Sequence, residues 1–163
     1  MTALQGKALF YHTPPFQQDM EVSGFFRLSA WISINTPDTD FYASVHEVAT
    51  DGSTIRLSSD ALRARYRQGL RLPELITTEE PLCYKFDRFT FVSRVIKQGH
   101  RLRLVIAPMG RLIEGLFTQK NFNGGGRVAD ECSENARAVT VRLFHDHSRP
   151  SVLSIPIGRA VVT

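Results

Sequence analysis

Alternation of apolar and polar residues with a period of two is the feature that most constrains how this chain can fold. Residues 22–34, VSGFFRLSAWISI, place five apolar side chains on one face of an extended strand: Phe26, Leu28, Ala30, Ile32 and Ile34. The other face would carry Arg27, Ser29, Trp31 and Ser33. Because successive side chains of a strand point to opposite faces, the pattern predicts a half-buried strand. Gly24 allows a kink that would divide it in two.

The same period recurs along most of the chain. Alternation at 41–46, 102–106 and 139–144 predicts further strands, and shorter ones are expected at 8–12, 53–57, 62–67, 82–91 and 150–158. Asp51-Gly52 and Gln98-Gly99 supply tight turns, and Pro156 requires a sheet edge or a bulge. Only 127–138 could hold a turn or two of helix. The fold class expected is therefore all-β, a two-sheet jelly-roll sandwich.

The size and charge of the chain exclude several classes of protein. Its 163 residues suit one domain, and no apolar run approaches the roughly 18 residues that span a bilayer. A net charge of +4 without a basic stripe interleaved with aromatics argues against nucleic-acid binding. Cys83 and Cys132 allow at most one disulfide and leave the compartment open. We expect neither a nucleic acid nor a membrane as partner.

The residues that could carry catalysis form no recognisable motif. An α/β-hydrolase nucleophile needs the signature G-x-S-x-G, which is absent from the sequence. His145-Asp146-His147 could place two imidazoles on one strand face, but a third metal ligand cannot be assigned, and polar strand-end residues are the default. Asp38 is better explained by a turn after Pro37 than by calcium, and Asp40 by a pair with Arg63, Arg65 or Arg67. We expect no catalytic residue, no metal and no cofactor.

Two regions are candidates for binding a partner. Residues 107–137 show almost no alternation, and a loop of that length is often functional or interfacial. Its centre could form a backbone nest for an anion, but we favour an interface there. Trp31, on the polar strand face, could meet a second domain; alternatively, Trp31, Tyr42, Tyr66 and Tyr84 could stack on a sugar ring. The interface candidates are Trp31, Asn121, Phe122, Asn123, Gly124 and Gly125.

Several of these segments, in this order, resemble one known family. They are DMEVSGFFRLSAWISINTPDTDFYASVHEV, DGSTIRLSSDALRARYR, QGHRLRLVIAP and FHDHSRPSVLSIPI, which span most of the chain. They are similar to the C-terminal jelly-roll domain of the X-Pro dipeptidyl-peptidase and cocaine esterase group of serine hydrolases. QKNFNGGG, residues 119–126, looks most like the glutaryl-7-aminocephalosporanic acid acylase branch of that group.

The resemblance implies a fold and a partner, and it transfers no catalytic residue. Residues 1–163 would be a single sandwich of the galactose-binding-domain-like type, the C-terminal fragment of a larger hydrolase. The partner would be the catalytic α/β-hydrolase domain of the same parent, which carries the triad, and the parent could form a homo-oligomer. An apolar interdomain patch is then expected, partly on residues 107–137. The alternative is a free-standing carbohydrate- or ligand-binding sandwich.

Overall fold

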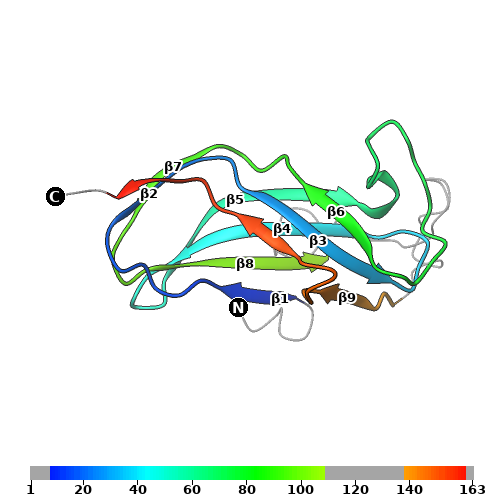
Figure 1. Ribbon diagram of the computed structural model, residues 1–163, viewed down its shortest axis with the longest axis horizontal. Coiled ribbons are helices and arrows are strands. Elements are labelled where there is room, and N and C mark those ends of the chain that lie inside the picture. The colour runs from blue at the N-terminus through cyan, green and yellow to red at the C-terminus, as the bar shows by residue number, and fades with distance from the viewer. Residues whose placement is uncertain (1–7, 109–137, 161–163) are drawn as a thin grey trace, which may run out of the picture.

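The structure of the chain is a computed structural model that describes residues 8–108 and 138–160. Within these ranges, antiparallel strands form two facing layers (Figure 1). One layer is a sheet of four strands in the order β1, β8, β4, β5. Their bounds are β1 Leu9–His12, β8 Arg101–Pro108, β4 Asp40–Val48 and β5 Thr54–Arg63.

The second layer consists of two smaller sheets that follow one another along the sandwich (Figure 1). In one, β3 (Arg27–Ile34) pairs with β6 (Leu82–Phe86), β10 (Val152–Ser154) and β9 (Val141–Phe144). In the other, β2 (Met20–Gly24) lies between β7 (Val92–Ile96) and β11 (Ile157–Ala160). The predicted all-β fold is confirmed; the galactose-binding-domain-like label stays a prediction.

A kink between the two smaller sheets explains why the long predicted strand is broken. Gly24 ends β2 at φ +135°, a conformation that L side chains rarely adopt. A Cβ there would lie 2.9 Å from the Cβ of Pro156, whose carbonyl accepts a hydrogen bond from the Ser23 amide. Pro156 in turn separates β10 from β11, so the single strand predicted at residues 150–158 is wrong: the proline lies between two short strands of different sheets.

The dry layer between the sheets contains the side chains that the alternation assigned to it. From the long segment these are Phe26, Leu28, Ala30, Ile32 and Ile34. From the opposite sheet they include Phe41, Ala43, Val45, Leu102, Leu104 and Ile106. The prediction of which residues face inward is therefore confirmed for these strands.

The predicted strand boundaries were wrong in two further places. Residues 62–67 are not a separate strand, because β5 continues to Arg63 and a short 3-10 helix, η2 (Ala64–Tyr66), follows. Residues 82–91 form only β6 and a connection, and β7 comes next without having been predicted. The helical turn suggested within 127–138 lies almost wholly outside the described residues. In the described part of the chain no helix is long and apolar enough to cross a membrane.

Candidate functional site

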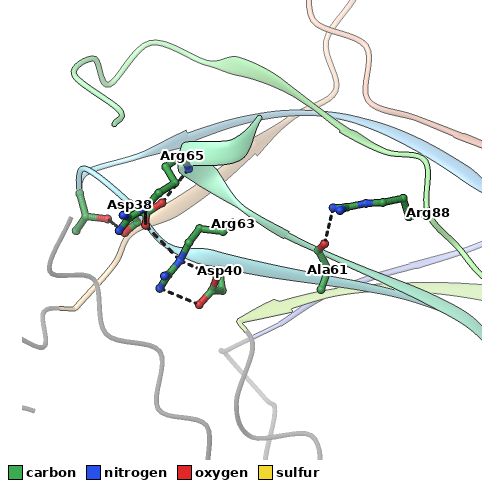
Figure 2. Close-up of polar contacts among 7 residues, drawn as sticks. Asp38, Asp40, Ala61, Arg63, Arg65 and Arg88 are labelled. Atoms are coloured by element: carbon green, nitrogen blue, oxygen red, sulfur yellow. Dashed lines mark hydrogen bonds and ion pairs between the residues drawn. The ribbon is translucent and has the colours of Figure 1, made fainter. Parts of the chain in front are cut away.

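The segment that joins β3 to β4 contains one charged residue, Asp38, which is only 1% exposed. Its Oδ1 accepts a hydrogen bond from the backbone amide of Arg65 at 2.9 Å, and its Oδ2 accepts one from Nε of Arg65 at 2.6 Å (Figure 2). Nε of Arg63 lies 3.3 Å from the same oxygen. Asp38 thus binds both the backbone and the side chain of η2.

Asp40 makes a separate pair with Arg63, whose Nε lies 3.1 Å from Oδ1 (Figure 2). The prediction that Asp40 pairs with one of the three arginines is confirmed. The prediction for Asp38 was incomplete, because this carboxylate holds η2 as well as lying next to Pro37. A buried acid with two arginines nearby is an ion-pair network that orients chain segments. The Asp38 carboxylate is therefore a structural ion-pair partner and does not have the arrangement of a catalytic acid or base.

Asp60 of β5 ties the connection between β6 and β7 to the first sheet. Its Oδ2 accepts a hydrogen bond from the Arg88 amide at 2.9 Å. Nη2 of Arg88 donates to the carbonyl of Ala61 at 3.0 Å (Figure 2). Since Arg88 lies in the connection between two strands of the opposite layer, its contact with the buried Asp60 links the two layers.

Glu47 forms a second link between layers near the other end of β4. Its Oε2 contacts Nε of Arg94 from β7, and its Oε1 lies 2.6 Å from Nδ1 of His100. The sequence analysis missed this cluster. A signal for it exists, because Glu47 shares the inward parity of Phe41, Ala43 and Val45 and lies opposite Leu102 of β8.

Within the described part of the chain, Ser44 and His46 have the geometry of a nucleophile and its base. Oγ of Ser44 lies 2.9 Å from Nε2 of His46. Ser44 is only 1% exposed, so a substrate carbonyl could not reach it. The described residues give the imidazole no carboxylate partner. Burial, with Arg103 and Arg56 nearby, lowers the pKa of His46. The pair therefore lacks both access and the third member of a triad.

Asp146 stabilises the turn after β9, in the segment considered as a metal site. Its Oδ1 accepts hydrogen bonds from the Ser148 hydroxyl at 2.6 Å and from the amides of Ser148 and Arg149 at 3.0 Å. The hydrogen bond from the Ser148 hydroxyl is the main cause that lowers the pKa of Asp146. The described residues contain no group of three possible metal ligands.

Trp31 is largely buried on the outer face of β3, so it offers no open platform for a sugar. It lies opposite Cys83 of β6 and Phe144 of β9. The Arg149 guanidinium lies 4.8 Å from the centre of the Phe144 ring. The interface candidates Asn121, Phe122, Asn123, Gly124 and Gly125 lie outside the described residues, as does Cys132, and Cys83 is a free thiol.

A cleft of about 380 Å³ opens between the layers, and Trp31 is not among the residues that line it. Its lining is mostly aliphatic and includes Leu28, Leu104 and Leu153. Tyr11 and His145 also line it, and their rings contact each other edge to face with the ring centres 6.2 Å apart. Sugars need many hydrogen-bonding partners, so this lining does not favour a carbohydrate.

Residues 3–109 match the model of the family described as the X-Pro dipeptidyl-peptidase C-terminal non-catalytic domain. The chain belongs to this family. The match covers both the Asp38 and the Glu47 clusters, so the ion pairs described above lie within the family domain.

Known relatives of this domain are larger proteins. The chain is 30% identical over 151 residues to the cocaine esterase of Rhodococcus sp. (strain MB1 Bresler), an alignment that covers 91% of this chain and 25% of the esterase. Two solved structures share its fold, each with a TM-score of 0.81. One is an α-amino acid ester hydrolase at 19% identity, with 96% of this chain and 26% of the hydrolase covered.

The other solved structure is an aminopeptidase from a marine sediment archaeon, Thaumarchaeota archaeon. It is 21% identical, with 97% of this chain and 27% of the aminopeptidase covered. The chain thus spans about a quarter of the length of each relative.

Proposed function

We propose that this chain is the non-catalytic β-sandwich domain of a larger serine hydrolase that cleaves ester or amide bonds. In that parent it packs against a catalytic α/β-hydrolase domain and helps to shape the substrate cleft. The observation that carries the proposal is the family match together with relatives about four times as long, named as an esterase, an ester hydrolase and an aminopeptidase.

The geometry of the described residues supports a role without catalysis. Their buried acids, Asp38, Asp60 and Glu47, are all engaged with arginines. The Ser44–His46 pair is closed to substrate. The domain also exposes large apolar side chains to solvent, among them Leu70 and Leu72, which are both more than half-exposed. Apolar surface of this kind is used to contact another domain.

The finer identity of the parent is also part of the proposal. Acylase chemistry is suggested by residues 119–126, and peptidase or esterase chemistry by the names of the relatives. In each case the specificity would reside in residues of the catalytic domain. We also propose that residues 1–163 fold as one domain.

A substrate panel tests the proposal directly. The 163-residue chain and the parent protein encoded by the whole reading frame are assayed on aminoacyl, glutaryl and simple ester chromogenic substrates, with and without a serine-directed phosphonate. We expect turnover that the phosphonate abolishes in the parent, and none in the chain alone. Phosphonate-sensitive turnover by the 163-residue chain would overturn the proposal, as would a parent that never reacts with the phosphonate.

A further inference from the structure

The segment between η2 and β6 projects from the end of the sandwich that lies opposite the C-terminus (Figure 1). Residues 68–75, named here the leucine loop, expose three large apolar side chains: Leu70 at 63%, Leu72 at 65% and Leu75 at 41%. None of the three belongs to the core cluster, whose nearest member is Ile76. An exposed leucine is ordinary by itself, but three within six residues form a concentrated apolar surface.

Hydrogen bonds at its base hold the leucine loop in a defined shape. The Glu74 amide donates to the carbonyl of Arg65 at 2.8 Å, and the Glu74 carboxylate lies 2.8 Å from Nη2 of Arg67. The Ile76 amide donates to the carbonyl of Pro37 at 2.8 Å. At the tip, the Leu72 amide donates to the carbonyl of Gly69 at 3.1 Å.

These contacts connect the loop to the buried Asp38 cluster, because Arg65 is bound by Asp38 through both its backbone and its side chain. A loop that is already ordered loses little conformational entropy when it binds a partner. The leucines are therefore presented for binding at a low entropic cost.

We propose that the leucine loop is the part of this domain that docks on the catalytic domain of the parent hydrolase. The inference rests on the proposed function, since it names the surface by which that contact is made. The occupant follows from length, because about three quarters of each relative lies outside the matched region. The composition also suits an interface, because exposed charged residues accompany the leucines in sequence: Arg71 within the loop, and Glu79 and Glu80 shortly after it.

A competing apolar surface provides the matched control. Phe25 and Phe91 are 55% and 58% exposed and contact each other edge to face at 5.4 Å, where β2 and β7 meet the kink. Phe25 lies between β2 and β3, and Phe91 is the last residue before β7. If this pair were the docking surface, its accessibility in the parent would fall and that of the leucine loop would not.

The experiment measures how fast a cysteine at each surface reacts with a maleimide. Leu72→Cys and, as the control, Phe91→Cys are made both in the 163-residue chain and in the whole parent. Peptide mass spectrometry separates these sites from Cys83 and Cys132. We expect Leu72→Cys to react at least about tenfold more slowly in the parent than in the chain alone, a ratio that corresponds to a predominantly closed contact. Phe91→Cys should react at similar rates in both.

The outcomes separate failure of this inference from failure of the proposed function. Equal rates for Leu72→Cys in a parent that reacts with the serine-directed phosphonate would overturn the docking surface alone. Protection of Phe91→Cys instead would assign docking to the other surface and also overturn it. Protection of Leu72→Cys that grows with the concentration of the isolated chain would identify a second copy as the occupant. A parent inert to the phosphonate would overturn the proposed function.

Discussion

The buried acids at the two ends of β4 differ in how exposed their cationic partners are. Asp38, just before the strand, binds the amide and guanidinium of Arg65 in η2 and also lies next to the guanidinium of Arg63 in β5. The side chain of Arg65, its principal partner, is only 10% exposed. Glu47, near the end of the strand, binds Arg94 and His100, and the Arg94 side chain is 41% exposed. One end fixes a connection within the same sheet, and the other joins the two layers.

The difference shows that burial of the partner matters as much as burial of the acid. When one member of a fully buried pair is removed, the other is left as an uncompensated charge in a medium of low dielectric constant. A half-exposed arginine can turn to water instead. The Asp38 end should therefore be the more sensitive one, although both acids are almost wholly buried.

Removing Asp38 should have the largest effect. Asp38→Ala removes the buried carboxylate that accepts hydrogen bonds from the amide and Nε of Arg65, and we expect a loss of about 3–5 kcal/mol in the free energy of unfolding. Urea denaturation of the 163-residue chain measures it. Asp40→Ala is the control, because its pair with Arg63 is partly exposed and should be worth about 1 kcal/mol or less. Equal losses from the two substitutions would refute the role assigned to Asp38.

Removing the charge of Glu47 should cost less. Glu47→Gln keeps the side-chain shape but weakens the contacts with Arg94 and His100, and we expect a loss of about 1–2 kcal/mol. The same denaturation series measures it beside Asp38→Ala. A loss for Glu47→Gln larger than that for Asp38→Ala would contradict the comparison of the two ends.

Replacing Tyr84 tests how the interior near Asp38 tolerates a buried hydroxyl. Its side chain is fully buried against Phe41, and its hydroxyl has no hydrogen-bond partner among the described residues. Because an unpaired buried hydroxyl is unfavourable, Tyr84→Phe should leave the free energy of unfolding unchanged or raise it by up to about 1 kcal/mol. A loss of more than about 1 kcal/mol would show that the hydroxyl is paired.

The Tyr84 hydroxyl should also make the stability of the fold depend on pH in the alkaline range. Burial raises the pKa of Tyr84 to about 12, with Arg67 opposing the shift and Asp38 adding to it. Since the folded state holds this proton more tightly than the unfolded state, the contribution to stability is complete below pH 10 and is lost as the pH rises toward 12. Tyr84→Phe should therefore decline less in stability over that range, as measured by thermal unfolding.

His46 lies on the face of β4 opposite to Glu47. Its replacement should produce the smallest change in stability. Its pKa is lowered below 6.5 by burial and by Arg103 and Arg56, so the unfolded state binds the proton more readily. Stability from this group is complete above pH 6.5 and is lost as the pH falls through the lowered value. The midpoint of thermal unfolding between about pH 7.5 and 5.5 should fall less in His46→Gln than in the wild type. Identical slopes would show that His46 does not contribute.

The sequence predicted the core better than it predicted the connections. Period-two alternation identifies inward residues because it follows from strand geometry alone, and this holds from Phe26 to Ile106. The boundary after Arg63 failed because the chain enters η2 through bonds to Asp38, more than twenty residues earlier in sequence. A local pattern cannot report a partner so distant. The tight turns at Gly52 and Gly99 were recoverable, since both glycines adopt the positive φ that their sequences suggest.

The same limit applies to the candidate site. Asp40 could be paired with an arginine from sequence because Arg63 follows in the next strand of a hairpin. The Glu47–Arg94–His100 cluster could not be assembled, because its members come from different layers. The leucine loop also escaped notice, since Leu70, Leu72 and Leu75 would be equally consistent with burial.

The sequence by itself determined that alternate side chains would enter a shared apolar layer, because strand geometry makes that a property of each segment. It also carried the resemblance to the domain family, which residues 3–109 confirm. Only the tertiary structure decided which acids meet which arginines and which apolar residues remain outside the core. Those outcomes depend on how the two layers are placed against each other, and residues far apart in the chain acquire their environment only when the layers meet.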